Sequence, residues 1–322
     1  MRHRERYSSI IDDIRFRSLR QGAHASSWSL IAAAACWGTA AVISKRAVDE
    51  IQPLTLLPIE LTVSVAVLSV AARARRERFT NTAQMRRLGA LGVLNPGLAY
   101  ALSLAGLARI TASMSVLLWA IEPVLILGFA YLIIRERISR ALGGCAAIAL
   151  TGVVLVVLHG DSHGSTTGVL LTIAGVAACA VYTVLSSRYL VDAATVMVVL
   201  VQQITALAFA LALLAGSFVV GQPHSLASVS TTGWISALAA GVLYYGVAFW
   251  FYLAGLRRVS AGHAGMFINL VPVFGVAAGA VFLGERLTGR QWGGAVLILA
   301  AVAVVVGLQM RPATEPGFDH SL

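Results

Sequence analysis

Two carboxylates, Glu60 and Glu122, lie well inside long apolar stretches of the sequence. A charged side chain at the centre of a bilayer costs about 2.5–3.5 kcal/mol on insertion scales, so such residues usually face the interior of a helix bundle or a wet cavity. A carboxyl group there can also take up and release a proton, which makes both residues candidates for proton coupling. The alternative for each is a hydrogen-bonded structural acid, and for Glu60 also a pairing with a nearby basic residue.

Ser115, Trp119 and Glu122 are spaced i, i+4 and i+7. This spacing places a hydroxyl, a large aromatic ring and an acid on one stripe of a helix, which we expect to face a substrate cavity. Pro123 follows at once and removes a backbone hydrogen bond. Membrane helices tolerate such a break where protein satisfies the freed carbonyl or where it lines a cavity. A simple proline kink is the alternative.

The remaining candidates are polar and aromatic residues at related places in the chain. Asn269 lies shortly before Pro272. Asn95 lies two residues before Gly97, and the pair Tyr244-Tyr245 directly precedes Gly246, which aligns with Gly97 in an internal repeat. A tyrosine near the end of a span can instead be an interfacial anchor, and a glutamine such as Gln202 or Gln203 can bond a neighbouring helix. The full set for substrate binding is Trp37, Asn95, Ser115, Trp119, Glu122, Tyr244, Tyr245 and Asn269, with Tyr182 and the two glutamines as lesser candidates.

The prolines belong to an internal repeat. Residues 97–139 return without a gap as residues 246–288, a shift of 149 positions that aligns Pro123 with Pro272 and Glu136 with Glu285. Chance similarity between apolar segments would not also align prolines and charged residues. The chain is therefore a duplication, in which Glu136 and Glu285 are expected to cap or pair at helix ends.

The composition predicts an integral membrane protein. The 322 residues are 58% apolar and 12% charged, with a mean hydropathy of +0.82, whereas soluble domains are about 25% charged. Ten apolar runs approach the roughly 20 residues that cross a bilayer. They lie near residues 27–44, 51–72, 88–108, 110–134, 141–158, 168–187, 193–216, 233–256, 259–284 and 291–310.

The predicted fold is all-α, with ten transmembrane helices in two inverted five-helix repeats. Five crossings are an odd number, so the second repeat inserts upside down relative to the first. Most of the 24 Lys and Arg residues then fall on one side, which places both termini in the cytoplasm and the chain in the cell (inner) membrane. The predicted parts are a basic tail 1–26, repeats 27–158 and 168–310, and a tail 311–322.

The chain resembles the EamA-like ten-helix family of the drug/metabolite transporter superfamily. The resemblance rests on Cys36-Trp37-Gly38 followed by Lys45, on Pro123 followed by Glu136-Arg137, and on Pro272 followed by the run 284–288. It implies export or exchange of small metabolites, often amino acids or amphipathic compounds, through a central cavity by alternating access. Two positions depart from the family: Glu60 stands where an arginine is common, and Arg135 where a glycine is common.

Several other classes of protein are disfavoured. The three cysteines and seven histidines lack metal-ligand spacing, so we expect no metal and no cofactor. The net charge of +10 fits basic cytoplasmic loops better than nucleic-acid binding. No phosphate-binding loop is present, so we expect no coupling to ATP in this chain.

The sequence therefore predicts a secondary transporter, not an enzyme, with a small-molecule substrate and membrane lipid as its partners. A lipid flippase and an integral-membrane enzyme acting on a lipid or isoprenoid remain alternatives, although the second lacks the clustered acids or histidines of such sites. Gly275, Gly279 and the pairs Gly143-Gly144 and Gly293-Gly294 indicate close helix packing. That packing occurs either within one chain or in a homodimer.

Overall fold

The structure is a computed structural model that describes residues 28–77, 79–135, 140–157, 165–186, 195–221, 225–256, 267 and 269–309. Every regular element in these ranges is a helix. The predicted tails and Glu136-Arg137 lie outside the described residues. The helices are a first helix Trp28–Val48, α2 Pro53–Ala74, α3 Ala83–Ala90, η1 Leu91–Val93, η2 Leu94–Leu98, α4 Ala99–Leu107, α5 Ala112–Trp119, α6 Glu122–Ile134, α7 Arg140–Val157, α8 Thr166–Ser186, α9 Thr195–Val219, α10 Thr231–Ala240, η3 Gly241–Val247, α11 Ala248–Leu256, α13 Val271–Leu283 and α14 Gly289–Gln309.

Seven of these helical segments are long and apolar enough to cross a membrane. Three shorter apolar helices, Arg140–Val156, Val271–Leu283 and Gly289–Val304, coincide with the other predicted spans. Large apolar side chains are exposed on the outside of the bundle, among them Leu132 at 69% and Val281 at 76%. Apolar surface of this kind is typical of helices that face lipid, so the chain is a multi-pass membrane protein.

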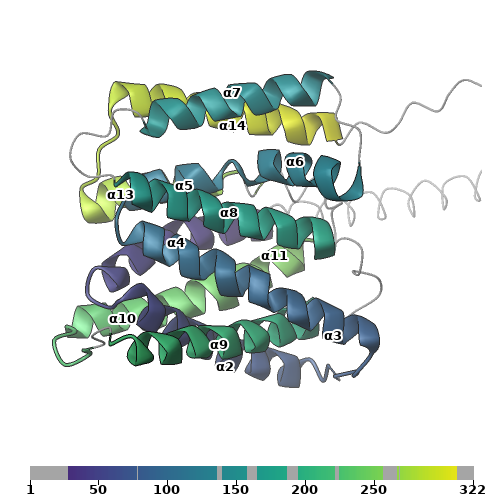
Figure 1. Cartoon of the computed structure of the whole chain (residues 1–322), viewed down its shortest axis with the longest axis vertical. Helices are drawn as coiled ribbons and strands as arrows, with labels where there is room; N and C mark the ends of the chain where they lie inside the picture. The colour runs from purple at the N-terminus through teal and green to yellow at the C-terminus, as the bar shows by residue number, and fades with distance from the viewer. Residues whose placement is uncertain are drawn as a thin grey trace, which may run out of the picture.

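Helices of one repeat pack against helices of the other, and two of these pairs are corresponding helices. α7 lies along α14 at one end of the long axis of the molecule, and α2 packs on α9 toward the other end (Figure 1). Between them, α5 contacts α13 and α4 contacts α8. The two halves therefore share one interleaved bundle.

Glycines allow some of these contacts, as predicted, but not at every predicted position. A Cβ on Gly275 would lie 2.8 Å from Val116 of α5, and one on Gly294 would lie 2.5 Å from the carbonyl of Gly152. By contrast, a Cβ on Gly293, or on either glycine of the pair 143–144, would meet nothing within 4 Å. Helix packing within the described chain therefore explains Gly275 and Gly294, but it does not explain Gly293 or the pair 143–144.

Several predicted spans are interrupted near their middle. The stretch 110–134, predicted as one helix, is divided at Ala120–Ile121 into α5 and α6. The reason is Pro123 at the start of α6, whose ring nitrogen has no hydrogen to donate to the preceding turn. Pro272 likewise stands at the start of α13. A kink at Asn95 and the π-helical segment η3 interrupt two further spans.

The ends of α6 and α13 are also alike. Arg135 caps α6 in the left-handed conformation with φ 56°, and Gly284 caps α13 with φ 68°. The two residues are 149 positions apart, which is the repeat shift. The arginine therefore keeps the backbone turn for which glycine is better suited.

Candidate substrate cavity

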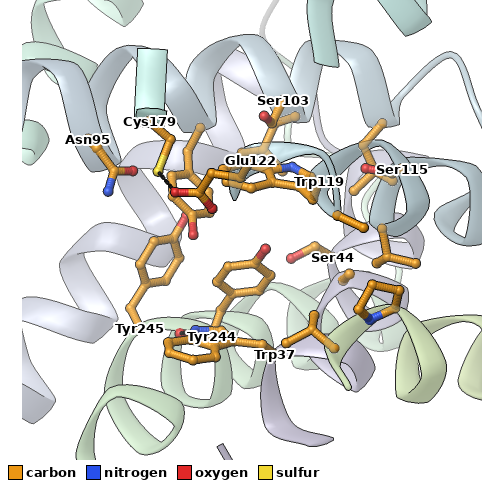
Figure 2. A pocket seen from close by; sticks show the side chains of 18 of the residues that line it. Trp37, Ser44, Asn95, Ser103, Ser115, Trp119, Glu122, Cys179, Tyr244 and Tyr245 are labelled. Atoms are coloured by element: carbon orange, nitrogen blue, oxygen red, sulfur yellow. Dashed lines mark hydrogen bonds between the residues drawn. The ribbon is translucent and has the colours of Figure 1, made fainter. Parts of the chain in front are cut away.

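A cavity of about 360 Å³ lies where the interrupted helices meet. All eight predicted substrate-binding residues line it, and so does Glu60. Figure 2 shows Trp119 and Glu122 on one wall, facing Trp37, Tyr244 and Tyr245 on the opposite wall. The structure thus brings together every residue of the predicted site.

Helix α5 and the start of α6 supply one wall. Ser115, Trp119 and Glu122 were predicted as one continuous helical stripe, yet the helix is interrupted between Trp119 and Glu122. All three still line the cavity because α6 begins at Glu122. The positive end of the α6 dipole therefore lies next to this carboxylate. Oε1 of Glu122 accepts a hydrogen bond from Sγ of Cys179 at 3.3 Å (Figure 2).

Glu60 reaches the cavity from α2. It is 1% exposed, and its Oε1 accepts a hydrogen bond from Oγ of Ser44 at 2.8 Å. The alternative of an ion pair for Glu60 is not found among the described residues; Lys45, which follows Ser44 in the first helix, pairs with Asp49 instead. Glu60 is therefore held by a neutral donor.

Aromatic rings fill much of the cavity wall. The ring of Tyr100 lies 5.5 Å from that of Trp119, 5.3 Å from that of Tyr244 and 5.2 Å from that of Tyr245, between centroids. Nε1 of Trp37 donates to the backbone carbonyl of Tyr244 at 2.9 Å. This bond attaches the first helix to η3. The rings therefore form a connected aromatic cluster with Tyr100 at its centre.

Three polar atoms beside these rings lack a hydrogen-bond partner within the described protein. They are Oδ1 of Asn95, Oγ of Ser103 and the hydroxyl of Tyr245. Buried polar groups are almost always hydrogen-bonded in folded proteins. All three residues line the cavity, but these three atoms are themselves buried.

The sequence interpretation missed several lining residues, and the repeat contains the signal that would have found some of them. The repeat shift of 149 positions pairs six lining residues of the first half with six lining residues of the second half. Tyr100, which was missed, aligns with Phe249. The other pairs are Asn95 with Tyr244, Ser103 with Tyr252, Ala120 with Asn269, Glu122 with Val271 and Pro123 with Pro272.

Of the lesser candidates, Tyr182 lines the cavity and the glutamines do not. Gln202 accepts from the hydroxyl of Tyr182 at 2.9 Å and donates to the carbonyl of Leu88 at 3.2 Å. Gln203 is hydrogen-bonded to Ser64 of α2. The alternative interpretation of the glutamines as bonds between helices is therefore confirmed.

Comparison with known proteins identifies relatives over most of the chain. The EamA-like transporter family matches residues 26–158 and again residues 166–307. An uncharacterized transporter of Archaeoglobus fulgidus is 26% identical over 285 residues, which are 84% of this chain and 94% of that protein. A probable amino-acid metabolite efflux pump of Salmonella typhimurium is 31% identical over 191 residues, which are 56% of this chain and 62% of that protein.

The fold is similar to that of a solved crystal structure. Its TM-score is 0.58 at 20% sequence identity, over 88% of this chain and 96% of that chain. At this level of identity the likeness concerns the fold alone.

Proposed function

The chain belongs to the EamA-like transporter family, and from that premise we propose that it is a secondary transporter that exports a small metabolite, either an amino acid or an amphipathic compound. The substrate binds in the central cavity. The observation that carries this proposal is the set of repeat-aligned residue pairs that line one cavity from both halves of the chain.

The proposed architecture has ten transmembrane helices in two inverted repeats. In an inverted repeat that rocks about a central site, residues near the axis stay close while the outer ends open and close in turn. The packing of α2 on α9 and of α7 on α14 supports this arrangement. Transport then proceeds by alternating access.

The proposed orientation places both termini in the cytoplasm of a cell with the chain in its inner membrane. The support is the excess of basic residues in the segments assigned to that side, such as Arg73, Arg75 and Arg76 after α2. Reporter fusions after Glu77 and after Gly221 should give cytoplasmic and external signals respectively. The same signal at both points would contradict the orientation.

Glu122 and Glu60 are the proposed proton-coupling groups because they are the carboxylates that line the cavity in the described chain. We test the transport function by profiling metabolites in medium and cytosol of cells with and without the protein. The intact chain should raise at least one compound in the medium and lower it in the cytosol. Asn269→Ala, produced at the same level in the membrane, should lose this effect. Identical profiles with and without the protein would contradict the function.

A further inference from the structure

We propose that the cavity selects organic cations with an apolar body, such as protonated amines, over zwitterionic amino acids and organic anions. The inference rests on the proposed function, in which this cavity is the substrate site. It concerns the chemical class of the substrate, and it follows from the charges, rings and unpartnered hydroxyls of the cavity wall.

The described wall of the cavity carries two acids and no basic side chain. Glu60 and Glu122 line the cavity, whereas the lining residues that the structure describes include no Lys, Arg or His. A buried charge is stable only when it is paired and hydrogen-bonded. The carboxylate of a substrate would meet two acids and no cationic partner among these residues, whereas an ammonium group would meet two carboxyl groups that can ionise to pair with it.

The helix ends do not reverse this balance. α6 and α13 both begin at the cavity, and a helix N-terminus carries about half a positive charge. Of these two helix ends, that of α6 already lies beside Glu122, so that of α13, next to Asn269, is the one left for an anion. The partial positive charge of a helix N-terminus, about half a unit, is smaller than the full negative charge of one carboxylate. The wall therefore stays negative on balance when only one of the two acids is ionised. A zwitterion, with its carboxylate at α13, is the competing substrate.

The aromatic cluster beside these acids is suited to a cation with an apolar body. Tyr100, Trp119, Tyr244 and Tyr245 have neighbouring ring centroids 5.2–5.5 Å apart. The face of such a ring attracts a cation and packs against an apolar body. In Figure 2 the hydroxyl of Tyr244 points across the cavity toward the wall that carries Glu122. A bound ammonium group between these walls would contact rings on one side and a carboxylate on the other.

Unpartnered hydroxyls are an independent observation at the same place. Tyr245 is 1% exposed and Ser103 is 6% exposed, and neither hydroxyl has a hydrogen-bond partner among the described residues. A hydroxyl oxygen has two lone pairs that can accept from an N–H group. Both residues line the cavity, and a change of rotamer that turned either hydroxyl into it would add a neutral acceptor to the two acids.

The test uses four compounds with one aromatic body and different charges. They are 2-phenylethylamine as the cation, phenylalanine as the zwitterion, 3-phenylpropionate as the anion and 2-phenylethanol as the neutral compound. Binding to the purified full chain is measured by calorimetry at neutral pH. The cation should bind at least about tenfold more tightly than each of the others. Equal or tighter binding of the zwitterion or the anion overturns the inference, and so does absence of binding by all four.

Variants locate the effect in the cavity. Glu122→Gln should weaken binding of the cation by about tenfold or more and leave the neutral compound unchanged. Asp49→Asn, which removes a carboxylate outside the cavity lining, is the matched control and should change neither. If Glu122→Gln leaves cation binding unchanged, Glu60→Gln must weaken it, and an unchanged affinity in both variants overturns the inference.

Uptake into proteoliposomes separates the two proposals. Binding and uptake of the cation support both. Binding of the cation without uptake supports the inference about the cavity and contradicts the transport function. Preferential uptake of the zwitterion supports the transport function and overturns the inference.

Discussion

Oε2 of Glu285 accepts hydrogen bonds from the backbone N–H of Ser113 at 2.8 Å and from the Ser113 hydroxyl at 2.5 Å. The two residues are 172 positions apart in the chain. Oε1 of Glu285 accepts from the N–H of Ala112 at 2.8 Å. Both N–H groups belong to the first turn of α5, where a helix offers them no partner. Glu285 therefore caps a first-half helix from the second half, which confirms its prediction as a cap.

Two further carboxylates outside the cavity make similar contacts. Glu50, between the first helix and α2, accepts from the N–H of Ser230 at 2.7 Å, directly before α10. Glu77, after α2, accepts from the N–H of Met197 in the first turns of α9 at 3.2 Å. An anion at a helix N-terminus is favourable because the dipole is positive there. Carboxylates in connecting segments thus bind helix starts of the other half.

Glu285→Gln should lower the stability of the protein by about 1–3 kcal/mol because it replaces two charge-assisted acceptors with one neutral acceptor and a misplaced donor. The measurement is the thermal midpoint of the purified protein in detergent. Asp49→Asn, which loses only an exposed pair with Lys45, serves as the control and should shift the midpoint little. Equal midpoints for Glu285→Gln and the parent would show that this cap is dispensable.

Two adjacent glycines of α14 provide a matched test of the α7–α14 contact. Gly294→Ala places a Cβ 2.5 Å from the carbonyl of Gly152 and 2.8 Å from Cγ2 of Val156, so α7 must move, at a cost of about 1–3 kcal/mol. Gly293→Ala meets nothing within 4 Å and should be neutral or stabilising by up to about 1 kcal/mol, because alanine favours helix. Thermal midpoints measure both. Shifts of the same sign and size would argue against this contact.

The matched caps of α6 and α13 make a reciprocal pair. A left-handed residue other than glycine costs roughly 1–2 kcal/mol, so Arg135→Gly should raise the stability of the protein by about that amount. Gly284→Ala should lower it for the same reason. Thermal unfolding of the two variants checks both signs, and a loss of stability in Arg135→Gly would mean that the arginine side chain makes a contact worth more than the strain.

Much of the candidate site followed from the sequence because rare residues in apolar segments are conspicuous. An acid such as Glu122 and a proline such as Pro123 are costly in a membrane helix, and each pointed to the cavity. Tyr100 was missed because a single tyrosine in a span fits an interfacial anchor equally well. Its place in the cluster depends on how α4 packs against its neighbours, which periodicity does not encode. The break at Ala120–Ile121 was missed because a proline can also bend a helix without dividing it.

Glu122→Gln tests whether this residue acts in transport or only in packing. Glutamine keeps the size of the side chain and an acceptor for the thiol of Cys179, so the thermal midpoint should stay within a few degrees of the parent. The variant loses the negative charge and the exchangeable proton of the carboxyl group. Flux into proteoliposomes should therefore fall by at least about tenfold and lose its dependence on pH. Glu60→Gln, which keeps an acceptor for Ser44, is the companion variant. Unchanged flux and an unchanged pH profile in Glu122→Gln would assign Glu122 a structural role. Coupling would then depend on Glu60, and Glu60→Gln must show the loss of flux and of pH dependence if either carboxylate of the cavity carries the proton.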